Sequence, residues 1–126
     1  MKFDIFLTLR LALAGTFIGH GFFAFTQKPA WIPYLMTVGF NQGTTLVLMQ
    51  IIGVIDFGVA AMAIFYPNKW VFGYALFWTL ATATIRPISG EHIMELVERS
   101  SNIAVPLALL IIQKKNAPKM RHFKLG

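Results

Sequence analysis

Long apolar stretches alternate with short polar or turn-forming stretches along the chain. A helix of ~20 mostly apolar residues crosses the hydrocarbon core of a bilayer. The pattern therefore predicts four membrane-spanning helices, at about 5–25, 44–66, 70–88 and 91–112. Short turns at 67–69 and 87–90 make consecutive helices antiparallel neighbours. We expect an all-α, integral membrane, antiparallel four-helix bundle as one domain over residues 1–113, followed by a basic tail over 114–126.

Composition agrees with a chain that lies in lipid. It is 56% hydrophobic, has a mean hydropathy of +0.64 and is only 13% charged, whereas a soluble domain is about 25% charged. The net charge of +6 is concentrated in the tail, which favours contact with anionic lipid headgroups over nucleic acid. The chain contains no cysteine, so disulfides and thiolate metal sites are excluded within it.

The positions of lysine and arginine predict how the bundle is oriented. An even number of helices places both termini on one side, together with Lys2, Arg10, Lys69 and the tail. Lys28 and Arg86 are expected on the other side. Because positive residues accumulate on the cytoplasmic side, both termini are predicted to be cytoplasmic.

The opposite, outer side then holds the loop between the first two helices and the 85–102 stretch. Trp31 and Tyr34 in that loop are interpreted as anchors at the membrane interface, in preference to ligand-stacking residues.

Polar residues are concentrated at the start of the fourth segment. On a helix turning by ~100° per residue, Glu91, Glu95, Glu98 and Asn102 form one stripe with Arg99 at its edge. A charge that faces lipid costs several kcal/mol. We therefore expect the stripe to face the other helices and to descend from the outer surface toward the middle of the bilayer.

The other helices supply partners for this stripe. His20 lies near the outer end of the first helix and Arg86 near that of the third. Intramembrane ionisable groups favour a functional site, although a set of ion pairs is the alternative. In the inner half, Arg10 and Asp56 are predicted to form a structural ion pair. The predicted outward-facing pocket is lined by His20, Arg86, Glu91, Glu95, Glu98, Arg99 and Asn102.

Metal and haem sites fit the sequence poorly. Bis-histidine haem ligation needs a second buried histidine, but His92 lies off the stripe and His122 lies in the tail. Di-metal carboxylate sites use Glu-x-x-His on facing helices, a pattern that the glutamates here do not make. A metal ion held by His20 and the glutamates is the weaker alternative, and we predict no metal site.

The first segment, "LRLALAGTFIGHGFFAF", resembles the DoxX family of small four-helix membrane proteins. The resemblance rests on Arg10, Gly15, Phe17 and the His20-Gly21 pair, and extends over most of the chain through its length, helix count and acidic second helix. The stretch "ATIRPISGEHIMELVERSSN" departs from the family pattern. The resemblance implies a multi-pass protein of the bacterial inner membrane that is linked to respiratory or quinone-coupled redox complexes.

The resulting hypothesis is a redox-linked subunit that binds a quinone headgroup or another small polar ligand. His20 and Arg86 would hydrogen-bond the ligand, and Glu95 or Glu98 would exchange protons with it. We do not expect the chain to carry electrons alone, and whether it belongs to an oxidoreductase stays open. Other membrane-protein subunits or further copies of the chain are the expected partners. The alternatives are a non-catalytic accessory or assembly subunit of a larger membrane complex, and a transporter of small solutes or ions.

Overall fold

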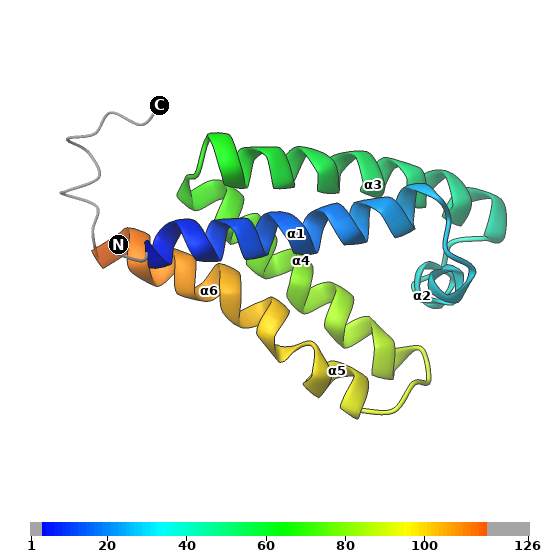
Figure 1. Ribbon diagram of the computed structural model, residues 1–126. Helices are drawn as coiled ribbons and strands as arrows, with labels where there is room; N and C mark the ends of the chain where they lie inside the picture. Colours follow the sequence, from blue (N-terminus) through cyan, green and yellow to red (C-terminus); the bar gives the residue numbers. More distant parts are fainter. Residues whose placement is uncertain (1–3, 116–126) are drawn as a thin grey trace.

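The computed structural model describes residues 4–115, and every regular element in this range is a helix (Figure 1). The expected all-α fold is therefore confirmed for the part of the chain that is described. Its long helices are α1 (Ile5–Phe25), α3 (Gln42–Phe65), α4 (Lys69–Ile88) and α6 (Ser100–Lys115). Its short helices are η1 (Pro29–Trp31), α2 (Ile32–Thr37) and α5 (Met94–Glu98). The predicted basic tail falls largely outside the described residues.

The first three long helices each begin where a side chain caps their free amides. Asp4, Asn41 and Asn68 each accept one or two backbone N–H groups from the following first turn, at 2.8–3.1 Å. Such caps satisfy amides that have no partner within the helix. The cap at Asn41 also explains why α3 begins at Gln42, two residues before the expected position.

The fourth segment differs from its prediction. A single helix over 91–112 is wrong, because the chain leaves α4 through Gly90, whose φ is +108°. This left-handed conformation suits glycine, which has no Cβ. The N–H groups of Gly90 and Glu91 donate to the carbonyls of Pro87 and Arg86, at 3.1 and 3.0 Å. The chain therefore turns before α5 begins at Met94.

A second interruption follows at Arg99, which separates α5 from α6. Its N–H donates to the carbonyl of Leu96 at 3.1 Å, a tighter turn than that of an α-helix. The next three residues, 100–102, are two serines and an asparagine, which compete with the backbone for hydrogen bonds. Pro106 within α6 also leaves the Asn102 carbonyl without an α-helical donor. The polar residues over 91–102 are consequently spread over a turn and two helices, and the single straight stripe that was expected does not form.

The helices α1 and α3 form the most extensive pair, and they run antiparallel side by side (Figure 1). They meet most closely at Gly21 and Gly53. A Cβ built on Gly53 would lie 2.8 Å from the Gly21 carbonyl oxygen and from the backbone of Phe25. Glycine is thus required at this contact, as is common where helices pack closely in membranes.

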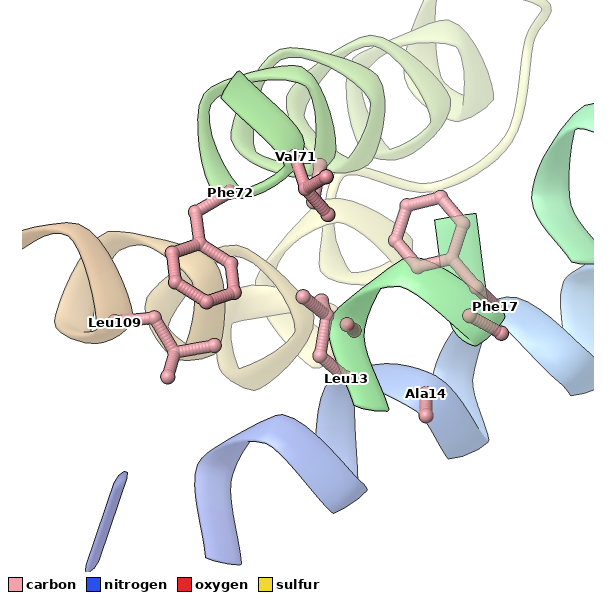
Figure 2. Packing of buried hydrophobic residues seen from close by; sticks show 9 residues of the cluster. Leu13, Ala14, Phe17, Val71, Phe72 and Leu109 are labelled. Carbon is pink, nitrogen blue, oxygen red and sulfur yellow. The ribbon is translucent and has the colours of Figure 1, made fainter. Parts of the chain in front are cut away.

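The hydrophobic core lies where α1 and α3 meet α4 and α6. Phe72 and Leu109, which have no exposed surface, pack with Leu13 between α4, α6 and α1 (Figure 2). Phe6 adds an edge-to-face contact with Phe72, with ring centroids 5.9 Å apart. Alanines on α3 and α4 let the larger side chains interlock. This end of the bundle is therefore closed by tight packing.

Two described helices, α1 and α3, are long and apolar enough to cross a membrane, with mean hydropathies of 1.4 and 2.1. The helix α4 has 20 residues and is long enough, but it is not apolar enough to meet that criterion. The helix α6 has 16 residues, a length of only about 24 Å at ~1.5 Å per residue. Large apolar side chains such as Phe22, Phe65 and Phe77 are exposed on the outside of the bundle, an arrangement that suits contact with lipid.

Candidate functional site

A cavity of about 240 Å³ lies at the end of the bundle opposite the hydrophobic core. At this end α4 runs away from the α1–α3 pair, and α2 lies beyond the end of that pair (Figure 1). The walls are mostly apolar and come from α1, η1, α2, α3 and α4. They comprise His20, Ala24, Trp31, Tyr34, Leu35, Val38, Met49, Ile52, Asp56, Trp78, Ala81, Thr82, Ile85 and Arg86.

Two of the predicted pocket residues, His20 and Arg86, line this cavity from opposite helices. Glu91 and Glu95 do not line it, but each lies beside Arg86, at 3.7 and 3.8 Å from its Nη1. The structure thus brings four of the predicted residues into one region.

The other three predicted pocket residues are not part of the cavity wall. Glu98 is exposed, while Arg99 and Asn102 are half-buried, and none of the three lines the cavity described here. Glu98 ends α5, Arg99 separates the two helices, and Asn102 lies in the first turn of α6.

Arg86 is the centre of a polar network at the mouth of the cavity. It is only 8% exposed, and its Nη1 donates to the Tyr34 hydroxyl at 3.0 Å. Its guanidinium also lies over the Tyr34 ring, 5.1 Å from the centroid. The Tyr34 hydroxyl in turn donates to Glu91 Oε2. The network ties α2 to α4 and to the turn that follows α4.

Tyr34 stays protonated over a wide pH range in this setting. Burial raises the pKa of Tyr34 to about 12, and the hydrogen bond to Glu91 acts in the same direction, while Arg86 opposes both. The hydroxyl therefore acts as a fixed donor between Arg86 and Glu91 and is not a group that exchanges protons near neutral pH.

His20 and Trp31 of η1 form another part of the cavity wall. The His20 ring meets the Trp31 ring edge-on, with centroids 5.4 Å apart. Trp31 also packs against Phe23, and the Lys28 ammonium lies 5.4 Å from the Trp31 centroid. The sequence favours Trp31 and Tyr34 as interfacial anchors over ligand-stacking residues, and in the structure both line the cavity.

The predicted ion pair between Arg10 and Asp56 does not form. Arg10 donates instead to the carbonyls of Ala63 and Ile64 at the C-terminal end of α3, with 2.9 Å from its Nε to the Ala63 oxygen. These carbonyls carry the negative end of the helix dipole and have no partner within the helix. Asp56 lies about two turns earlier on α3, beyond the reach of Arg10.

Asp56 lines the cavity instead of pairing with Arg10, a position that the sequence did not predict. The residue is only 1% exposed, and its Oδ1 has no hydrogen-bond partner among the described residues. The Nε of Arg86 is likewise buried without a partner there. One unsatisfied acceptor and one unsatisfied donor thus belong to residues that line the same mostly apolar space. In the sequence, Asp56 is marked only as a single carboxyl residue within a long apolar helix.

The cavity also includes Trp78, which stacks on Tyr74 with an interplanar angle of 7°. Its spacing from Thr82 and Arg86 puts all three on one face of α4. No group of three or more His, Asp or Glu side chains in the described part of the chain is arranged to hold a metal ion. The arrangement suits a small molecule with a flat apolar body and polar ends.

Comparisons of the chain with models of protein families, with curated proteins and with solved structures found no match.

Proposed function

We propose that this chain is a DoxX-like, multi-pass protein of the bacterial inner membrane that binds a quinone headgroup as a redox-linked subunit. The resemblance of the first helix to that family and the low charge of the chain support this proposal. The exposed apolar side chains and the two helices suited to crossing a bilayer support the membrane location. Other membrane subunits, or further copies of the chain, would be its partners.

The proposal includes an orientation in which α1, α3, α4 and α6 cross the bilayer. The start of α1 and the end of α6 lie at the same end of the bundle (Figure 1). Lys69 begins α4 and Lys114 is near the end of α6. The basic tail follows α6 in the sequence, and this distribution of positive residues favours cytoplasmic termini. The cavity lies at the other end and would open toward the outer surface.

The cavity is the observation that carries the ligand proposal. A quinone ring is flat and apolar and bears carbonyl oxygens that accept hydrogen bonds. Aromatic and aliphatic walls match the ring, and the unsatisfied Nε of Arg86 and the ring of His20 can face its oxygens. Ligand sites of this kind combine apolar walls with a few polar groups that fix orientation. The chain would bind and orient the ligand, while electrons come from a partner.

Two tryptophans in the cavity allow a direct test. Protein in lipid nanodiscs is titrated with decylubiquinone, and quenching of Trp31 and Trp78 fluorescence is measured. We expect saturable quenching in the wild type. Ala81→Phe fills the cavity from α4 and should weaken binding by roughly tenfold or more.

Leu80→Phe is the matched control, because Leu80 is adjacent on α4 but points outward and is 43% exposed. It should bind like the wild type. Quenching that never saturates, or that is identical in all three proteins, would contradict the proposed function.

A further inference from the structure

The inner part of the cavity contains a carboxyl group that neither the network at its mouth nor the rest of the described chain satisfies. Asp56 is on the fifteenth position of the 24-residue helix α3, near the middle of the bundle. Its carboxyl is almost completely buried, and its Oδ1 lacks a hydrogen-bond partner among the described residues. A buried polar group without a partner costs free energy.

No described cation neutralises this carboxyl directly. Arg10 is engaged with the carbonyls at the end of α3, and Arg86 is held beside Tyr34, Glu91 and Glu95. The Oδ1 atom of Asp56 therefore needs a hydrogen-bond donor, and we expect a molecule bound in the cavity to supply it. A carboxyl oxygen that carries no proton accepts hydrogen bonds.

At the mouth of the cavity the unsatisfied group is a donor, and it therefore needs an acceptor. Arg86 has only donors, and its Nε is buried without a partner in the described chain. A ligand that satisfies both positions must present a donor at the Asp56 end and an acceptor at the Arg86 end. A quinone offers acceptors alone, whereas a hydroquinone hydroxyl can donate and accept.

We propose that the cavity selects the reduced, hydroquinone form of its ligand by accepting a hydrogen bond from a ligand hydroxyl at Asp56. This inference rests on the proposed function and adds the form of the ligand and the residue that recognises it. It also replaces Glu95 and Glu98 as the carboxyls in contact with the ligand, since neither lines the cavity.

A pair of ligands that differ by one donor tests the inference without any mutation. Para-nonylphenol carries a hydroxyl, and its methyl ether has the same ring and chain but no O–H. Each is used to displace decylubiquinone from wild-type protein in nanodiscs, with concentrations corrected for partitioning into lipid. We expect the phenol to compete up to about tenfold better, as befits one hydrogen bond.

Asp56→Leu removes both carboxyl oxygens at similar side-chain volume and should bring the two competitors to equal strength. Retained quenching by decylubiquinone would show that this variant keeps its cavity. Equal competition in the wild type would overturn the inference while leaving the proposed function intact, and so would a preference that persists in Asp56→Leu. Absence of saturable quinone binding would instead remove the proposed function itself.

Discussion

The two ends of the helix bundle differ in how completely their side chains fill the space between the helices. At the core end, Leu13, Phe72 and Leu109 interlock with small alanines, and these three large side chains are fully buried. At the cavity end, α4 leaves the α1–α3 pair, and aromatic and charged side chains border a space that they do not fill. The contrast indicates that the tightly packed core and the cavity proposed to bind a ligand occupy separate parts of one small fold.

The largest expected effect comes from breaking the closed end. Phe72→Ala should destabilise the protein by about 3–5 kcal/mol, because it leaves a cavity in a fully packed region. Thermal unfolding in detergent, followed by circular dichroism, measures the loss. Phe77→Ala on the same helix is the control, since that side chain is 63% exposed. Equal losses in the two variants would show that the core end is not tightly packed.

The contact between α1 and α3 continues past the core and fixes one side of the cavity. Gly53→Ala places a Cβ 2.8 Å from backbone atoms of α1 and should cost about 1–3 kcal/mol through overpacking. Gly58→Ala on the same helix has open space around its Cβ and should stabilise α3 by up to ~1 kcal/mol. Unfolding of both variants in the same detergent gives the comparison. The same sign of change in both would argue against the close contact.

The smallest effect concerns the network at the cavity mouth. Tyr34→Phe removes the hydroxyl between Arg86 and Glu91 and should cost about 0.5–1.5 kcal/mol at neutral pH. The pKa of Tyr34 rises from its ordinary value of 10 to about 12 on folding. The folded state therefore binds its proton more tightly than the unfolded state does, so this contribution is complete below pH 10 and is lost as pH rises toward 12.

Unfolding free energies measured below and above pH 10 test this sign. The wild type should lose more stability across that interval than Tyr34→Phe. The same loss in both proteins would place Tyr34 outside the network.

The pattern of apolar residues predicts the bounds of those helices that have continuous apolar runs and clear N-terminal caps. The first helix has the expected bounds, and the second and third begin within two residues of them. The fourth prediction was wrong because a helical wheel assumes a continuous helix. Gly90 and Arg99 interrupt it, and such interruptions depend on local hydrogen bonds that an apolar count does not contain.

The candidate site was predictable only where residues sit on regular helices. His20 and Arg86 could be found from their positions near the ends of apolar segments, and both line the cavity. The role of Tyr34 depends on how the loop after α1 folds back, which no periodicity reveals. Depth along the two helices predicts a pair between Asp56 and Arg10, whereas the free carbonyls at the end of α3 are the acceptors that this arginine contacts.

The contact of Arg10 with those carbonyls has a consequence for how the chain is made. The acceptors lie 53 and 54 residues later in the sequence, so they do not yet exist when the first helix leaves the ribosome. A lone arginine in the hydrocarbon region costs several kcal/mol. In the membrane protein proposed above, α1 would therefore wait at the insertion machinery or the bilayer surface until α3 has been synthesised. The two helices would then enter lipid together as a hairpin, with the arginine already satisfied.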